Sequence, residues 1–164
     1  MKKLVAMLAL MAVNCAFGQQ AETPMQLVDR AAILEVMHKY VWSVDSLDAD
    51  GYVSVFTKEA EIDSNGTVMK GHDDIRKVVT GQIERQAANR AAGKPVGALY
   101  HVISNERIAL KSATQAVYQS YWQTMRKGTD GRYTTGGFGR SEDLLVKSDG
   151  RWLIQSRKLT VFTD

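Results

Sequence analysis

The chain has 164 residues, of which 45% are apolar and 24% are charged, as in an ordinary globular protein. Its formal net charge of +3 includes Lys2 and Lys3 and is too small for the basic surface with which proteins bind nucleic acid, so we expect no nucleic-acid partner. No internal repeat or low-complexity tract is present, and the length therefore predicts one domain.

Residues 1–18 have the layout of a secretory signal peptide. Lys2 and Lys3 form a positively charged start, and residues 4–13 form an apolar run that is too short to span a bilayer. Small residues precede Gln19, where we expect the mature chain to begin. The sequence therefore predicts a periplasmic or secreted protein with no membrane contact after cleavage.

Cys15, the only cysteine, offers an alternative in which the mature protein stays attached to the membrane. It could carry a lipoprotein anchor, although the preceding Asn14 is larger than the residue that such signals favour. Cleavage before Gln19 would remove this cysteine and leave no disulfide and no thiolate ligand. We expect residues 19–28 to be a flexible N-terminus and residues 29–164 to form the folded domain.

Two helices are predicted at the start of this domain. Apolar residues recur every three or four positions from Arg30 to Asp45, which predicts an amphipathic helix capped by Asp29. The pattern is interrupted at residues 48–51. The apolar residues among 52–56 then predict a short second helix.

A small hairpin and a third helix are predicted next. Residues 60–70 contain the dipeptide Asn65-Gly66, which tolerates the positive φ angles of a type I′ turn between two strands. Asp73 and Asp74 follow, and carboxylates are favourable near the positive end of a helix dipole. An apolar stripe at helical spacing continues from there.

Four long strands are predicted in the second half of the chain, which is rich in β-branched and aromatic residues. They cover residues 99–111, 116–126, 134–147 and 152–162. The polar turns between the later strands are short, so they suit antiparallel hairpins and leave no room for crossover helices. The order α-α-β-β-α-β-β-β-β predicts an α+β fold in which a curved antiparallel sheet wraps around the helices as a cone-like barrel.

The tract Gly136-Gly137-Phe138-Gly139 lies inside one of these strands. A phosphate-binding loop would be followed by a helix, and no helix is predicted there. We therefore interpret the tract as a bulge or sharp bend that curves the sheet.

His101 is the strongest catalytic candidate, because imidazole titrates near neutral pH and this histidine lies within a strand. Leu99 and Ile103 share its face, so burial would require partners for the ring nitrogens. Asp45 lies at the apolar side of the first helix, where a carboxylate also needs a donor. Either the two residues pair or each finds a separate partner, and spacing in sequence leaves both possibilities open.

Arg157 alternates with Leu153 and Leu159 and therefore points to the apolar side of the last strand. A guanidinium there needs either an anionic ligand or a structural partner with a buried carboxylate. For metals, no two histidines stand four residues apart and the mature chain would lack cysteine, so we expect no metal and no cofactor.

The chain resembles the SnoaL-like family of the nuclear transport factor 2-like fold over almost the whole predicted domain. The resemblance is carried by Asp29-Arg30-Ala31-Ala32-Ile33, Tyr40 with Val44-Asp45, Gly71 with Asp74-Ile75, Tyr100-His101 with Asn105, and Asp149-Gly150-Arg151-Trp152-Leu153-Ile154. Each of these cues is weak alone, and their order along the chain makes them specific together.

The resemblance implies a catalytic pair. Scytalone dehydratases and hexachlorocyclohexane dehydrochlorinase use an aspartate near the end of the first helix and a histidine early in the long sheet, and Asp45 and His101 match these positions. Arg157 resembles an arginine in the last strand of the dehydrochlorinase. The second catalytic histidine of scytalone dehydratase has no counterpart near Met125, so the substrate does not carry over. Other members of the fold, such as the small subunit of ring-hydroxylating dioxygenases, do no chemistry.

Two functions follow as hypotheses. The first is a cofactor-free lyase or isomerase, in which His101 removes a proton from an apolar or aromatic small molecule, Asp45 orients the imidazole and Arg157 stabilises negative charge. The expected substrate-binding residues are Tyr40, Ile62, Leu99 and Tyr121. The second is a non-catalytic periplasmic module for ligand binding or assembly. In either case the resemblance implies a homodimer or higher homo-oligomer.

Overall fold

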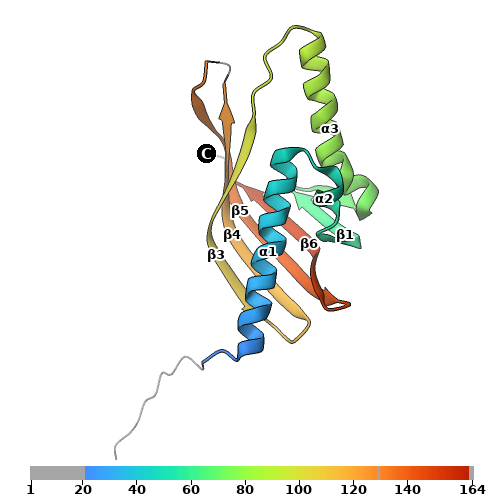
Figure 1. Cartoon of the computed structure of the whole chain (residues 1–164), viewed down its shortest axis with the longest axis vertical. Helices are drawn as coiled ribbons and strands as arrows, with labels where there is room; N and C mark the ends of the chain where they lie inside the picture. The colour runs from blue at the N-terminus through green and yellow to red at the C-terminus, as the bar shows by residue number, and fades with distance from the viewer. Residues whose placement is uncertain (1–20, 129, 163–164) are drawn as a thin grey trace, which may run out of the picture.

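The computed structural model describes residues 21–128 and 130–162. The predicted signal peptide, its cleavage site near Gln19 and the alternative anchor at Cys15 lie outside the described residues. Figure 1 shows helices packed against one face of a curved sheet. The predicted fold class is confirmed.

The described part of the chain contains three helices and a six-stranded sheet. The helices are α1 (Pro24–Ser46), α2 (Ala49–Val53) and α3 (Gly71–Ala91). The strands are β1 (Phe56–Ser64), β2 (Thr67–Lys70), β3 (Leu99–Leu110), β4 (Gln115–Lys127), β5 (Tyr133–Ser148) and β6 (Arg151–Val161). They are arranged in the order β2-β1-β6-β5-β4-β3, which leaves β3 as an edge strand.

The four long strands end within one residue of their predicted limits, and they pair antiparallel as expected. One pairing differs from the prediction, because β1 runs parallel to β6. These two strands are separated in the chain by α3 and four strands, so no hairpin determines their relative direction. The sheet is thus antiparallel except at this junction.

Helix α1 begins earlier than predicted. Thr23, rather than Asp29, caps it: the Thr23 hydroxyl accepts from the backbone N–H of Gln26, whose side chain accepts from the backbone N–H of Thr23 in return. Pro24 occupies the first turn, where its missing N–H costs nothing. The assignment of residues 24–28 to a flexible N-terminus is thereby corrected.

The boundary between α2 and β1 also differs from the prediction. Helix α2 ends at Val53, and β1 starts at Phe56, within the stretch predicted to be helical. Val53, Val55 and Phe56 are all buried. A short run of buried apolar residues fits a helix or a strand equally well, so periodicity could not place this boundary.

The predicted turn and the predicted bulge are both confirmed. Asn65 and Gly66 have φ angles of 49° and 86°, as a type I′ turn requires between β1 and β2. In β5, Gly136 and Gly137 together lie opposite the single residue Thr124 of β4, because the register shifts between the pairs on either side. The glycine tract therefore contains the expected bulge.

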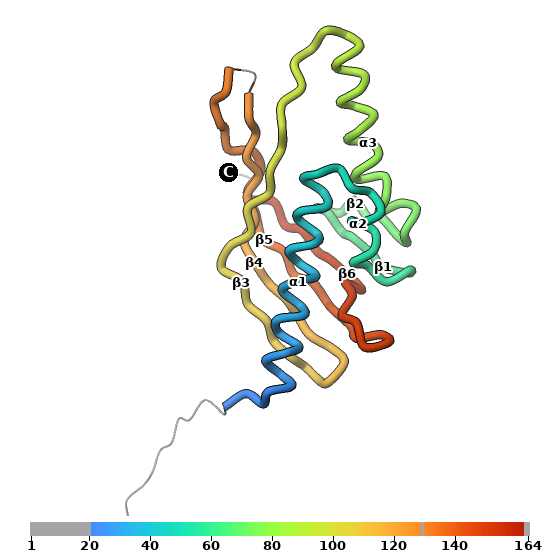
Figure 2. Tube along the Cα trace, viewed as in Figure 1, coloured from blue at the N-terminus to red at the C-terminus, as the bar shows by residue number. Residues whose placement is uncertain are grey.

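The core lies between α1, α2, α3 and the concave face of the sheet. At its centre Tyr40, Tyr52 and Phe56 pack with ring centroids 5.1–6.0 Å apart. Figure 2 shows that α1 runs along the sheet, while α3 extends past the end of α1 beside the start of β3. Side chains therefore fill the middle of the cone, and the cavities among the described residues lie nearer to its edges.

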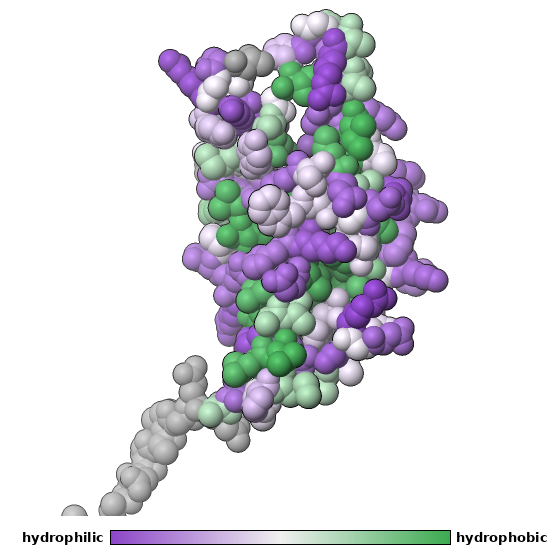
Figure 3. All heavy atoms as spheres, in the orientation of Figure 1, coloured by the Kyte–Doolittle hydropathy of each residue, from purple (hydrophilic) through white to green (hydrophobic). Residues whose placement is uncertain are grey.

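The outer surface is mixed. Figure 3 shows polar side chains over most of the face that carries α1, with smaller apolar patches among them. None of the helices in the described residues is both long enough and apolar enough to cross a membrane.

Candidate functional site

The structure brings Asp45 and His101 together. Asp45 lies in the last turn of α1, and His101 is the third residue of β3. The Nδ1 atom of His101 is 2.6 Å from Oδ1 of Asp45. The backbone N–H of His101 also donates to the Asp45 carboxylate, at 3.0 Å from Oδ2.

This contact determines which ring nitrogen is available for chemistry. The Asp45 carboxylate accepts a hydrogen bond, so Nδ1 of His101 carries the hydrogen. The lone pair of the neutral ring is then on Nε2, on the far side of the imidazole from the aspartate. The pair can therefore act as a general base at Nε2, with the carboxylate stabilising the imidazolium that forms.

A cavity of about 510 Å³ lies directly beside the pair. It is lined by Val41, Trp42, Asp45, Ser46, Tyr100 and His101. The side chains of His101 and Asp45 are 22% and 15% exposed, so they are reachable from this cavity while most of their surface is shielded. The volume is in the range of small-molecule sites.

Two aromatic residues of this cavity were missed by the sequence reasoning. The side chains of Trp42 and Tyr100 are 75% and 42% exposed, which is unusual for rings of this size. Trp42 precedes Asp45 by three residues, which places both on one side of α1, and Tyr100 is the neighbour of His101. These spacings were the available signal, and they place two apolar faces at the mouth of the cavity.

Arg157 is not in this cavity. Its Nη1 donates to Oδ1 of Asp143 at 2.8 Å, both residues are buried, and its guanidinium lies 4.2 Å from the centre of the Tyr40 ring. This arrangement is the structural pairing that the sequence left open as an alternative. Burial raises the pKa of Asp143 to about 6, although the positive charge of Arg157 acts in the opposite direction.

The four expected substrate-binding residues lie in different places. Tyr40 and Ile62 are buried in the core. Tyr121 lies on the outer face of the sheet and stacks on Phe138, because alternation along β4 turns its neighbours inward. Leu99 lines a separate cavity beside α3. None of the four lines the cavity beside the His101–Asp45 pair.

The described residues contain no group of three or more His, Cys, Asp or Glu side chains that could hold a metal ion. The cavity beside His101 contains the His101–Asp45 pair and an aromatic rim. With these side chains it offers proton transfer at Nε2 of His101 next to an apolar surface.

A sheet of this order, curved around helices with a histidine and an aspartate paired at its edge, places the protein in the class of α+β cones with the nuclear transport factor 2-like fold, which is also described as cystatin-like. The SnoaL-like domain family matches residues 25–158. The chain belongs to this family.

Several solved structures share the fold. A variant of Rv3472, a Mycobacterium tuberculosis protein of unknown function, has a TM-score of 0.75 and 20% identity over 90% of this chain and 79% of its own. A proposed scytalone dehydratase from Novosphingobium aromaticivorans has a TM-score of 0.68 and 24% identity, covering 85% and 87%. The hexachlorocyclohexane dehydrochlorinase LinA-type3 from Novosphingobium barchaimii has a TM-score of 0.68 and 16% identity, covering 85% and 90%.

No curated protein sequence matches the chain. The similarity to the solved structures is below 25% identity and therefore concerns the fold. The family and its fold are established by these comparisons, and function has to be argued from the site.

Proposed function

We propose that the protein is a cofactor-free lyase or isomerase that removes a proton from an apolar or aromatic small molecule. The observation that carries this proposal is the 2.6 Å contact between His101 Nδ1 and Asp45 Oδ1 beside a cavity of about 510 Å³. Two relatives with this fold are described as a dehydratase and a dehydrochlorinase, and both names denote eliminations. They support the reaction class and leave the substrate open.

The proposed reaction starts with the substrate's apolar body against Trp42 and Tyr100. Nε2 of His101 takes a proton from a carbon atom, and the electron pair of the broken C–H bond forms a C=C bond. In a lyase the leaving group departs with its own electron pair. In an isomerase the electron pair of a neighbouring double bond takes the proton at another carbon atom, so the double bond shifts. Asp45 holds the ring in the required tautomer and stabilises its positive charge.

Proton abstraction can be tested before the substrate is known. The protein would be incubated in D₂O with a panel of aromatic ketones and polychlorinated cycloalkanes, and NMR would follow exchange of carbon-bound hydrogen and loss of chloride. Wild type should accelerate one of these reactions, and His101→Gln and Asp45→Asn should lose that acceleration. Arg76→Gln, an exposed change on α3, serves as the matched control. Equal rates in the wild type and the His101→Gln variant would refute the assignment.

A second function is favoured by a specific observation. The middle of the cone is filled by Tyr40, Tyr52 and Phe56, and the charge of Arg157 is already paired with Asp143. In the described residues no cation therefore lines the cavity beside His101 to stabilise a developing negative charge. A non-catalytic binding module would bind apolar ligands there equally well in wild type and in the Asp45→Asn variant, with no exchange in D₂O.

We also propose that the protein is exported and that the N-terminal signal is removed near Gln19. The support is the charge and hydropathy pattern of residues 1–18. The intact mass of the protein recovered from the periplasm or medium would test this. A mass that retains residues 1–18, or one with a lipid on Cys15, would contradict it.

We propose, further, that a second copy of the chain covers the outer face of the sheet. Tyr121, Phe138 and Phe162 form an exposed aromatic cluster there, with ring centroids 5.3–6.3 Å apart. Light scattering should give the mass of a dimer or higher oligomer for wild type and of a monomer for Phe138→Glu. A wild-type monomer at high concentration would contradict this proposal.

A further inference from the structure

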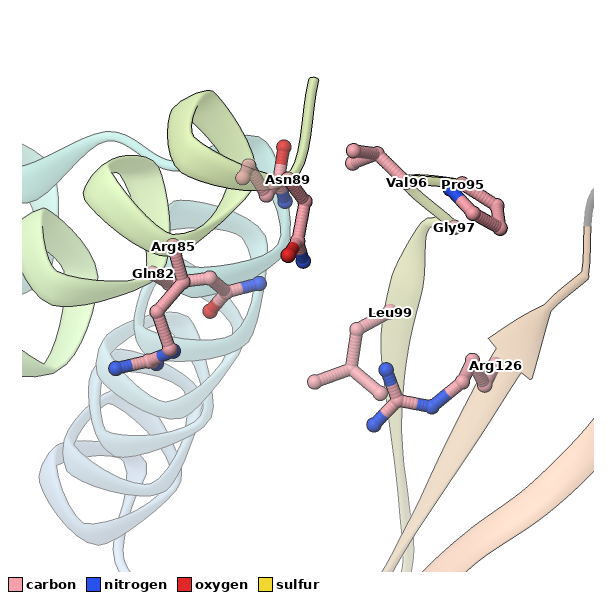
Figure 4. A pocket seen from close by; sticks show the side chains of 9 residues that line it. Gln82, Arg85, Asn89, Pro95, Val96, Gly97, Leu99 and Arg126 are labelled. Carbon is pink, nitrogen blue, oxygen red and sulfur yellow. The ribbon is translucent and has the colours of Figure 1, made fainter. Parts of the chain in front are cut away.

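A second cavity lies between α3 and the start of the long strands. Its volume is about 300 Å³, and it is lined by Gln82, Arg85, Gln86, Asn89, Pro95, Val96, Gly97, Leu99 and Arg126. It shares no residue with the cavity beside His101. Figure 4 shows its two walls, the helix on one side and strands β3 and β4 on the other.

The charged side chains that line this cavity are all positive. Two arginines and three residues with neutral carboxamides line it, and no carboxylate does. Among residues 21–128 and 130–162, neither Arg85 nor Arg126 forms an ion pair, whereas Arg76 and Arg157 each do. A cavity with this lining is electrostatically suited to an anion.

The donors reach the cavity from both walls. Arg126 lies opposite Leu99 in the β3–β4 ladder, and its side chain extends toward the helix, while the carboxamide of Gln82 extends from α3 toward the strands (Figure 4). The Oε1 atom of Gln86 accepts from Arg90 at 3.1 Å, which leaves the amide N–H groups of Gln86 as donors. The planar guanidinium of Arg126 matches the two oxygens of a carboxylate.

One wall is apolar and firmly placed. Pro95, Val96 and Leu99 supply its surface. The loop that carries them is held against β4, because the backbone N–H of Lys127 donates to the carbonyl of Ala98 at 2.9 Å. Gly97 lies so close to the Lys127 carbonyl that a Cβ would be only 2.3 Å from that oxygen. The cavity therefore combines a positively charged group with an apolar surface.

We propose that this cavity is a binding site for a small organic carboxylate, with the carboxylate at Arg126 and the apolar body against Leu99 and Val96. Arg85 adds to the positive potential from the helix side. The site uses residues other than the His101–Asp45 pair, so it stands whether or not that pair is catalytic.

Benzoate is a suitable probe because its ring fits the apolar wall and its carboxylate fits Arg126. It would be titrated into ¹⁵N-labelled protein, and we expect the amide signals of Val96, Gly97 and Leu99 to shift with a Kd on the order of millimolar, as for other fragment-sized ligands. Arg126→Gln should weaken binding by about fivefold to tenfold, since a charge-assisted hydrogen bond is lost at an exposed position.

Three controls make the result decisive. Benzamide, the neutral isostere, should bind at least about fivefold more weakly than benzoate, because it lacks the charge that Arg126 pairs with. Arg76→Gln on the same helix and His101→Gln in the other cavity should leave the Kd for benzoate unchanged. Equal binding of benzamide, an unchanged Kd in Arg126→Gln, or shifts confined to the signals of Trp42 and Tyr100 would each overturn the proposal.

Discussion

Asp45 holds His101 at two points, the ring nitrogen Nδ1 at 2.6 Å and the backbone nitrogen at 3.0 Å. One carboxylate thereby joins the end of α1 to the edge strand β3 and also selects the tautomer of the imidazole. Because β3 has a neighbour on one side only, this contact supplies part of the support that a second strand would otherwise provide. Asp45 therefore has both a structural role and a chemical role.

Replacing Asp45 should separate these two roles. Asp45→Asn keeps one acceptor oxygen, which can bind either the ring or the backbone N–H of His101, so we expect a modest loss of stability and a loss of proton-abstraction activity of about 10²- to 10⁴-fold. Asp45→Ala should cost about 1–3 kcal/mol of unfolding free energy, because both donors lose their acceptor. Urea denaturation and hydrogen exchange in D₂O measure the two effects. Equal stability of wild type and the Ala variant would mean that the contact does not support β3.

Arg157→Met should be strongly destabilising at pH 7, by about 3–5 kcal/mol, because it leaves the buried Asp143 carboxylate without a cation. The folded-state pKa of Asp143 is already raised by burial to about 6, above the unfolded value, and removal of Arg157 raises it further. The folded variant therefore takes up this proton at a higher pH than the folded wild type, so the difference in stability should shrink as the pH falls to about 6 and stay constant below that, where both folded proteins hold the proton.

Denaturation of wild type and Arg157→Met across this pH range measures the effect. The double change Arg157→Met with Asp143→Leu should recover much of the lost stability, since no buried charge remains. A loss in Arg157→Met that stays constant as the pH falls from alkaline values to about 6 would show that Asp143 is not the source of the penalty.

Asp29 should stabilise the protein at neutral pH and lose this effect in acid, which is the opposite of the pH dependence expected at Asp143. Hydrogen bonds from Lys147 at 2.7 Å and from the Trp152 indole at 2.9 Å lower the pKa of this buried carboxyl. Its contribution is therefore complete above the unfolded pKa of about 3.9 and is lost as the pH falls through the lower folded value. Asp29→Asn should cost about 1–2 kcal/mol at pH 7, and this cost should shrink as the pH falls below about 3.9, the unfolded pKa.

The matched control for this prediction is Asp74→Asn. Asp74 also has a lowered pKa through its contact with Lys77, but the pair is exposed on α3, so its loss should leave the unfolding free energy nearly unchanged. Thermal unfolding at several pH values compares the two variants. If both lost the same amount, burial of the ion pair at Asp29 would not explain the effect.

Gly139→Ala should destabilise the sheet by about 1–3 kcal/mol. An added Cβ would lie 2.2 Å from the Thr160 carbonyl oxygen and 2.7 Å from the Trp122 ring, so the backbone or the indole would have to move. Gly81→Ala, within α3, meets only the movable end of Arg85 and should instead stabilise by about 0.5–1 kcal/mol. Unfolding curves that moved in the same direction for both would contradict this account.

Local features of the sequence were sufficient for much of the fold. The ends of β3 to β6, the Asn65-Gly66 turn and the bulge at Gly136-Gly137 follow from alternation and turn chemistry among neighbouring residues. The capping box of Thr23 and Gln26 was also a local signal, and it explains the start of α1 that the prediction placed too late. The histidine and aspartate of the site could likewise be selected singly, because each was a polar group at an apolar position.

Their contact, and what surrounds it, was decided by the tertiary structure. His101 and Asp45 are 56 residues apart, and only the packing of α1 against β3 brings them within hydrogen-bond distance. The same packing gives Arg157 the carboxylate of Asp143 as its partner and leaves Trp42 exposed beside the cavity. A sequence determines which groups need partners through local burial and periodicity, whereas the choice of partner depends on which distant elements the fold places side by side.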